Sequence, residues 1–587
     1  MDRQRQHGLP PALCLSVLAA ILLLACSPEP DAAPQDPGPD VQISQSAPAP
    51  AEDPDGAAGG GTVIFGTGQE PVTLNPLIEA GDTTATARVL SHQFPGAYTL
   101  EPDLTFTPEV IDGEAVITED PFSVTYTLRE DARWSDSAPI SAHDLAWLYE
   151  TVTTLEADGV DEVRTPPGYD LITDYTIGDR RTITFNFREP YAAWRTLFST
   201  ILPAHVLEGE DPATMLADGL PPVSGGPYVF DGWNQGTELR LVRNDDYWGD
   251  PPALDALVFR FIPDATTLTR LLIAGELDAS TLEPDAQDIA RLEAAADAIE
   301  FAVGPGPVWE HLDFNTRVPG LDRRFVREAI AMGIDRERIV ERVIRPVDPA
   351  ATVLQNPFWL AGAAAHRPAF ERWSHAPAAA RDLLAANGCE AGDDPVFVCD
   401  GVRLSFRLGT TAGNDRREQT QRLVQEDLSD IGIETIIDND PGALFFDRLD
   451  TPQGCGGRCD FDLAIFPWRS EPNPMALADA YGCDEGEEGG EGDEGDEGEP
   501  RPRERNFSGW CAAELTAVMD AANDAVSSEA NARLWNEAAQ LLATQMPVLP
   551  LYQHPSLLAW DTRLTGPQLH PTAGTHLWNS HTWAYAP

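Results

Sequence analysis

The chain has 587 residues, 42% of them hydrophobic, so it is long and apolar enough for two or three domains with packed cores. Its formal net charge is −56, and all 39 basic residues are arginines, because the sequence contains no lysine. So acidic a chain is not expected to bind nucleic acid. The missing lysine also excludes Schiff-base chemistry and a P-loop lysine.

The beginning of the chain has the pattern of a secretory signal peptide. Two arginines precede an apolar run from Leu13 to Leu24, which is too short to span a bilayer comfortably. The run ends in Leu-Leu-Ala-Cys, which looks like a lipobox. We therefore expect residues 1–25 to be a signal peptide and Cys26 to carry a lipid. The alternative is a plain signal peptide with an incidental cysteine.

Residues 26–61 are rich in Pro, Ala, Asp and Gly and have few apolar anchors, so they are predicted to be a disordered tether. No later apolar run is long enough for a membrane-spanning helix. The sequence thus predicts a soluble body on the extracytoplasmic side of a membrane, held there by lipid.

The first part of the body alternates between strand and helix patterns. Residues 63–65 and 122–128 are predicted strands. Ser141 and Asp144 have capping-box spacing and open a predicted helix with an apolar face that runs to Leu155.

The segment from Pro222 to Gly249 is the most informative in the chain. A Pro-Val-Ser-Gly-Gly-Pro-Tyr turn leads into a strand, and the polar link Asn-Gln-Gly then leads into a second strand that alternates at Leu239 and Leu241. This pattern predicts a β-hairpin. Gly225 and Gly226 are expected to supply unusual backbone dihedrals.

The second half continues with α/β patterns. Residues 254–262 are a predicted strand, and Asp322 is expected to cap a helix with apolar residues from Phe325 to Ile330. Residues 404–437 read as a β-α-β unit whose helix ends at Gly432. Residues 461–466 are a further strand, and the helices of 513–545 precede a closing strand at 546–552.

Six cysteines remain once Cys14 and Cys26 are set aside, and an even number in an oxidising compartment favours disulfides. Sequence proximity favours three pairs: Cys389–Cys399, Cys455–Cys459 and Cys483–Cys511. The last would close a loop around a low-complexity acidic run. A metal or redox site at Cys455 and Cys459 is the alternative, but no histidine lies close by to complete a zinc set.

Catalytic motifs are not found. The chain has no G-x-S-x-G, H-E-x-x-H or P-loop pattern, and no spacing singles out a triad. Residues 438–442 faintly resemble a calcium loop, but the glycine comes one place early and no glutamate closes it. We expect no enzyme activity, no cofactor and no metal.

Many of these segments together resemble the extracellular solute-binding proteins of family 5, the oligopeptide- and dipeptide-binding proteins of ABC importers. The resemblance is carried by the Gly-Gly-Pro-Tyr turn and the Arg-Asn-Asp-Asp-Tyr-Trp-Gly string that ends at Gly249. It extends to the Asp-Arg-Arg-Phe-Val-Arg-Glu-Ala-Ile segment from Asp322 and the Met-Pro-Val-Leu-Pro-Leu-Tyr strand that ends at Tyr552. In all it covers about residues 63 to 555.

The resemblance implies an α/β, periplasmic-binding-protein-like clamp of two lobes joined by crossover strands, which closes around its ligand. The implied division is 62–105 as the first part of lobe I, 106–215 as its subdomain, 216–309 as its second part, 310–547 as lobe II with an acidic insertion at 484–505, and 548–587 as the third part of lobe I.

The resemblance also points to a ligand site around residues 466–474. Family members that bind peptides carry an acid here that holds the ligand's α-ammonium. Glu471 is the nearest match, one residue short in spacing, and Asn473 stands where an Asp is usual. Trp468 is expected in the cleft wall or the core, and Glu471 is otherwise a solvated loop acid. Tyr98 is a further ligand-binding candidate, with packing as its alternative, and Trp309, Phe358 and Trp359 are weaker ones.

The sequence therefore predicts a monomeric, lipid-anchored solute-binding protein that delivers an oligopeptide to ABC permease subunits. The alternatives are a nickel chelate, a glycoside or a polyamine as ligand, or a surface receptor or chaperone-like lipoprotein without a transport role. A secreted hydrolase is a third alternative.

Overall fold

The computed structural model describes residues 60–157, 165–217, 219–282, 284–450, 460–484, 501–503, 505–572 and 577–586. The predicted signal peptide, Cys26, nearly all of the tether, the Cys455–Cys459 pair and most of the acidic insertion lie outside these residues. Among the described helices, none has both the length and the apolar composition of a membrane span.

A ten-stranded mixed sheet organises the body, in the order β17-β16-β18-β12-β21-β11-β1-β10-β9-β8. Its strands are β1 Thr62–Thr67, β8 Tyr228–Asn234, β9 Glu238–Arg243, β10 Ala256–Phe261, β11 Ala279–Leu282, β12 Ile299–Phe314, β16 Ser405–Gly409, β17 Glu434–Ile437, β18 Leu463–Arg469 and β21 Val548–Asp561. The predicted hairpin is confirmed as the antiparallel pair β8–β9. The predicted mixed α/β class is confirmed as well.

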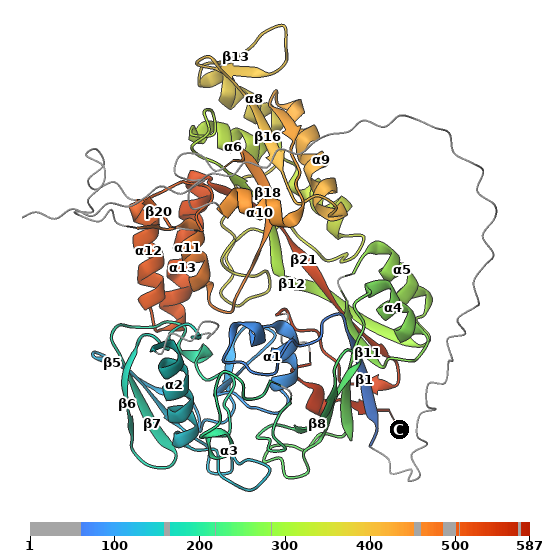
Figure 1. Ribbon diagram of the computed structural model, residues 1–587. Helices are drawn as coiled ribbons and strands as arrows, with labels where there is room; N and C mark the ends of the chain where they lie inside the picture. Colours follow the sequence, from blue (N-terminus) through green and yellow to red (C-terminus); the bar gives the residue numbers. More distant parts are fainter. Residues whose placement is uncertain are drawn as a thin grey trace, which may run out of the picture. The chain divides into compact units, whose positions relative to one another are not determined.

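Two long strands, β12 and β21, connect two separate hydrophobic cores (Figure 1). The first half of β12 pairs with β21 residues 555–561, and its second half pairs with residues 548–553 and with β18. One core contains Val63 and Leu241, and the other contains Leu312 and Leu549. We call the parts around these cores lobe I and lobe II.

Helices flank the strands in both lobes. They are α1 Thr84–Leu90, α4 Ala265–Ile273 and α5 Ala286–Ala294 in lobe I, and α6 Arg324–Gly333, α7 Arg336–Ile339, α8 Pro377–Ala386, α9 Asp415–Asp430, α10 Gly442–Asp450, α11 Ala478–Tyr481, α12 Ala513–Asp524 and α13 Ser528–Gln545 in lobe II. The predicted β-α-β unit is confirmed, because β16 and β17 pair in parallel with α9 between them. Gly432 ends this helix with a φ of +79°.

A smaller four-stranded sheet lies within the chain of lobe I. Its order is β4 Val116–Glu119, β5 Phe122–Thr127, β7 Thr182–Phe187 and β6 Ile172–Ile177. Helix α2 (Ala142–Ala157) begins after Ser141, whose backbone N–H donates to the Asp144 carboxylate at 2.7 Å. This is the carboxylate half of the predicted capping box. Asp144 also accepts from the Ala204 N–H at 3.0 Å, which ties α2 to α3 (Ala204–Leu207).

The remaining strands form short ribbons. They are β2 Tyr98–Leu100 with β3 Phe106–Pro108, β13 Cys389–Ala391 with β14 Phe397–Cys399 and β15 Val402–Arg403, β19 Cys483–Asp484 with β20 Arg501–Pro502, and β22 Leu564–Thr565 with β23 Ala584–Tyr585. Two of the three predicted disulfides are confirmed: Cys389–Cys399 joins β13 to β14, and Cys483–Cys511 joins β19 to the segment before α12.

The predicted cap of helix α6 is wrong. The N-cap residue is Arg323, whose side chain makes no capping bond. Asp322 instead accepts from the Gly320 N–H at 2.7 Å, within the turn that Gly320 opens with a φ of +99°. The carboxylate therefore lies one residue too early, and is already used, to satisfy the helix N–H groups.

The role predicted for Gly225 and Gly226 is also wrong in its mechanism. Neither glycine has a positive φ. A Cβ on Gly226 would lie 2.4 Å from the His92 carbonyl oxygen, and one on Gly225 would lie 2.9 Å from Pro95 Cδ. These glycines are required for close backbone packing, not for an unusual dihedral.

Candidate functional site

A cavity with a volume of about 790 Å³ lies between the chain around the small sheet and lobe II. One wall is formed by residues 103–106, Glu114, Ala192, Ala193, Arg195 and Thr196. The other is formed by Trp359, residues 363–365, Arg367, Pro472 and Asn473, and by the first turns of α13. A cavity of this size is in the range that encloses most of a drug-sized ligand.

The wall of this cavity is balanced in charge. Its arginines and acids are equal in number: Arg195, Arg367 and Arg533 against Asp103, Glu114 and Glu529. Arg195 donates from both Nε and Nη2 to Oε1 of Glu114, so this pair is neutralised within the wall. A chain with a net charge of −56 thus presents a nearly neutral surface where a solute would be enclosed.

The lobe II wall is held by amide hydrogen bonds. Asn536 donates to the Ala365 carbonyl at 2.9 Å, and Asn356 donates to Asn536 Oδ1 at 2.9 Å. Asn356 Oδ1 in turn accepts from the backbone N–H of Trp359 at 3.2 Å. The segment with Trp359 is therefore fixed against α13 before any ligand binds, which lowers the ordering cost of binding.

The structure brings only part of the predicted site to this cavity. Asn473 lines it and also accepts from the Met475 N–H at 3.2 Å, so its side chain orients the turn that follows. Glu471 is exposed and precedes the lining residue Pro472 by one position. Trp359, a weaker candidate from the sequence, does line the cavity. Trp309 is buried in the core of lobe II.

Trp468 does not line the cavity but packs beside it. It is the penultimate residue of β18, and its ring stacks parallel to Phe507 and His311 at centroid distances of 6.0 and 6.1 Å. His311 and Asp313 are both buried, 3.4 Å apart. Burial lowers the pKa of His311 to about 3 and raises the pKa of Asp313, so this pair is neutral.

Tyr98 is a core residue in this structure. Its side chain is 6% exposed, and its hydroxyl accepts from the Ala115 N–H at 3.0 Å. The ring meets Phe106 and Trp194 edge-on. Because Phe106 lines the cavity, Tyr98 supports its wall from behind and does not contact its interior.

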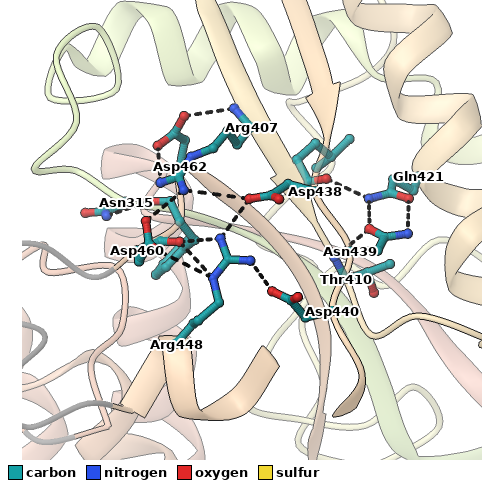
Figure 2. A network of polar contacts seen from close by, with 12 residues as sticks. Asn315, Arg407, Thr410, Gln421, Asp438, Asn439, Asp440, Arg448, Asp460 and Asp462 are labelled. Atoms are coloured by element: carbon teal, nitrogen blue, oxygen red, sulfur yellow. Dashed lines mark hydrogen bonds and ion pairs between the residues drawn. The ribbon is translucent and has the colours of Figure 1, made fainter. Parts of the chain in front are cut away.

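The carboxylates of Asp438 and Asp440, the residues of the faint calcium-loop pattern, pair with arginine side chains (Figure 2). Arg448 donates to both carboxylates, and Arg407 holds Asp460 at 2.7 Å. The space beside them is about 10 Å³, roughly that of one water molecule. Nor does the described part of the chain contain any group of three or more acid, His or Cys side chains placed to hold a metal.

Sequence reasoning missed Arg195, Arg367 and the asparagines of the lobe II wall. These residues come from segments that are far apart in the chain, and none of them belongs to a recognisable motif. No periodicity or spacing marked them, because only the packing of the lobes brings them together.

One half-buried carboxylate predicts a pH-dependent stability. Glu109 follows β3 and accepts from the Gly96 N–H at 3.0 Å and the Thr99 hydroxyl at 3.2 Å. Burial nevertheless raises its pKa from 4.5 to about 7. Because the folded state holds this proton more tightly, the stabilisation is fully present below pH 4.5 and is lost as the pH rises through 7.

We expect Glu109→Gln to flatten the fall in unfolding free energy between pH 5 and pH 8, measured by urea denaturation at each pH. Glu130→Gln, at an exposed position, is the control and should leave the pH profile of the parent unchanged. Identical profiles for Glu109→Gln and the parent would show that Glu109 does not titrate in this range.

The geometry described so far, two lobes with separate cores, two long connecting strands and a cavity between them, is that of a clamp-type solute-binding protein. Residues 105–485 match the family described as bacterial extracellular solute-binding proteins, family 5, middle region. The chain belongs to this family, as the sequence resemblance indicated.

Individual relatives cover most of the chain. The oligopeptide-binding protein OppA of Mycobacterium tuberculosis is 26% identical over 528 residues, which are 88% of this chain and 83% of OppA. The periplasmic EDTA-binding protein EppA has a TM-score of 0.75 at 22% identity, covering 90% of this chain and 97% of EppA. AppA of Bacillus subtilis, solved with a nonapeptide, has a TM-score of 0.63 at 20% identity and covers 90% of this chain and 100% of AppA. These structures show that the fold is the two-lobe solute-binding type.

Proposed function

We propose that this protein is the substrate-binding lipoprotein of an ABC importer and that it captures an oligopeptide by closure of its two lobes. Cys26 would carry the lipid, and the closed protein would deliver its ligand to the membrane permease as a monomer. No catalytic step is part of this function. The protein would act on the extracytoplasmic side of the membrane.

The observation that carries the proposal is the charge-balanced cavity of about 790 Å³ between the two lobes. A peptide is zwitterionic, elongated and mixed in polarity. It suits a wall that combines amides, apolar side chains such as Trp359 and Leu104, and both signs of charge. A polyamine would require an excess of acids in the wall, so we do not favour that alternative.

The names of the relatives support a peptide as the ligand and suggest one alternative class of ligand. OppA is named for oligopeptide binding, and AppA was solved with a nonapeptide. EppA is named for EDTA binding and has a higher TM-score than AppA. A metal chelate or a similar non-peptide solute is therefore the second candidate, favoured by the arginines that a polycarboxylate could bind.

We propose the following division of the chain for this clamp: residues 62–105, 216–309 and 548–587 form lobe I, residues 106–215 its subdomain, and residues 310–547 lobe II with an acidic insertion at 484–505. At the edges of this division, Trp309 of β12 and Leu549 of β21 pack into the lobe II core, so both connecting strands cross between the lobes next to these residues, which is the place for a hinge.

Native mass spectrometry of the purified protein tests the proposed function directly. We expect an excess mass that resolves into short peptides when the protein is denatured. An excess that resolves into a chelate or sugar would replace the peptide by that solute. A protein that carries no ligand and binds no member of a random peptide library would overturn the proposal.

Glu471 is the candidate partner of the ligand's α-ammonium. We expect Glu471→Ala to weaken binding of peptides with a free amino terminus about tenfold or more, because a charge-assisted hydrogen bond contributes about 1.5–3 kcal/mol. Isothermal titration calorimetry with matched free and N-acetylated peptides measures this effect. The acetylated peptides should bind parent and variant equally.

Glu514→Ala, at an exposed position in the first turn of α12, provides the control for this measurement. It removes the same charge from lobe II without changing the loop that precedes the cavity. If Glu471→Ala and Glu514→Ala bind free-amine peptides with equal affinity, Glu471 is not part of the site.

A further inference from the structure

The two connecting strands lose their regular pairing at two places, of which the longer lies before Trp309. Pro305 of β12 pairs with Pro555 of β21, but the next pair is Trp309 with Gln553. In β21, residues 306–308 therefore have only His554 opposite them, although the Gln553 amide donates to the Gly306 carbonyl at 2.9 Å and Val308 pairs with β18. Two prolines and two glycines in residues 304–307 further reduce the backbone N–H groups and the side-chain packing available here. The ladder is weakest at this point, so the chain bends here most easily.

A fully buried carboxylate lies beside this weak point. Glu310 is 0% exposed, and both of its oxygens are bound. Oε1 accepts from Arg417 Nε at 3.0 Å, and Oε2 lies 2.7 Å from His554 Nε2. Arg417 also donates to Thr411 Oγ1 at 2.7 Å. These bonds connect β12, β21 and helix α9.

The contacts of His554 determine its protonation. Its Nδ1 lies 3.1 Å from Arg416 Nη1, and a guanidinium can only donate. Nδ1 must therefore accept, which leaves the proton on Nε2, where it is donated to Glu310. His554 is thus a neutral imidazole between an arginine and a carboxylate, and it orients the Arg416 side chain.

Arg416 extends this network from α9 to the segment between β11 and α5. Its Nη2 donates to the Pro284 carbonyl at 3.1 Å. Pro284 lies between β11 and α5, whose side chains Leu282 and Ile289 belong to a third hydrophobic cluster, which also contains Leu557 of β21 and Val347. Arg416 itself belongs to the first turn of α9, in lobe II.

We propose that Arg416 is a latch between the lobes, oriented by Glu310 and His554, that stabilises the interlobe angle seen here. Through His554, which lies opposite the interrupted part of β12, Arg416 ties this part of the ladder to the β11–α5 connection. It therefore adds a restraint on bending to the one that the Gln553–Gly306 hydrogen bond supplies there. The latch needs no ligand, so it holds whichever solute the cavity binds.

Hydrogen–deuterium exchange of the ligand-free full-length protein tests this latch. In Arg416→Gln we expect exchange to rise about tenfold in two segments, residues 286–290 and residues 306–310, because a charge-assisted bond is lost on each side of the hinge. Exchange in β16 and α8 should stay at the parent level, which shows that lobe II is folded.

Arg422→Gln is the matched control. It lies on the same helix, where it forms an ion pair with Glu418 at 3.9 Å. Its exchange should equal that of the parent in both segments. If Arg416→Gln matches Arg422→Gln, or if its exchange rises equally throughout lobe II, then Arg416 is not a latch. Either result leaves the proposed ligand function untouched, because no ligand is used.

Discussion

Replacing Arg336 by methionine should destabilise lobe II by about 3 kcal/mol. Arg336 is 5% exposed, and no carboxylate pairs with it among the bonds described here. Its guanidinium donates instead to four backbone carbonyls, those of Leu354, Pro550, Phe370 and Trp373, at 3.0 to 3.2 Å. Methionine fills a similar volume but leaves these buried acceptors without donors.

The four carbonyls belong to three segments of lobe II, so the loss should appear as a lower urea midpoint for this lobe. Burial lowers the pKa of Arg336 to about 10, and the side chain is still charged at neutral pH. Arg342→Met, six residues later and exposed, is the control and should change the unfolding free energy by less than about 0.5 kcal/mol. Equal midpoints for the two variants would refute the role assigned to Arg336.

Gly226→Ala should destabilise lobe I by about 3 kcal/mol, close to the upper end of the usual cost of overpacking. The added Cβ would lie 2.4 Å from the His92 carbonyl oxygen and 2.9 Å from the carbon of that carbonyl. Both are backbone atoms. The backbone N–H groups of Gly226 and Tyr228 also donate to this region, to the Gln93 and His92 carbonyls at 3.0 Å. The two segments cannot separate without breaking these bonds.

Gly232→Ala in strand β8 is the matched control. It lies in the same hairpin, has no positive φ, and a Cβ there would meet no atom within 4 Å. We expect its thermal midpoint to equal or slightly exceed that of the parent, since alanine restricts the unfolded chain. If the Gly226→Ala and Gly232→Ala proteins have the same thermal midpoint, the turn can shift to accept the methyl group.

The absence of lysine explains why single arginines hold several parts of this fold together. Arg327 donates to the carbonyls of Met546, Leu321 and Gln545, much as Arg336 does in its own surroundings. A planar guanidinium with five donors can serve several carbonyls at once, which a lysine ammonium does less well. In an acidic chain, these interior arginines hold backbone segments together with no carboxylate among the bonds described for them.

Much of the fold could be read from local pattern. The β8–β9 hairpin, the β16-α9-β17 unit and the pairs Cys389–Cys399 and Cys483–Cys511 depend on residues that are near in sequence, and the structure has all of them. The cap of α6 was misassigned because two adjacent residues compete for one position. Gly226 was misread because the atom that excludes a side chain belongs to His92, more than a hundred residues away.

The candidate site was likewise only partly predictable from local sequence patterns. Its neighbourhood was marked by the segment that ends in Asn473, and the family was indicated by strings of residues spread along the chain. Whether Tyr98 faces a cavity or a core, and which arginine meets which acid in the cavity wall, depended on distances between segments that no local pattern encodes.

By itself, the sequence determined the family, the α/β class, the local elements and the proximal disulfides, because periodicity, turn chemistry and spacing act within a few residues. Only the tertiary structure decided where the cavity lies, that its wall is neutral in so acidic a chain, and that Arg416 reaches from lobe II to Pro284. These features arise from side chains far apart in the chain, and the packing of two separate cores sets the distances between them.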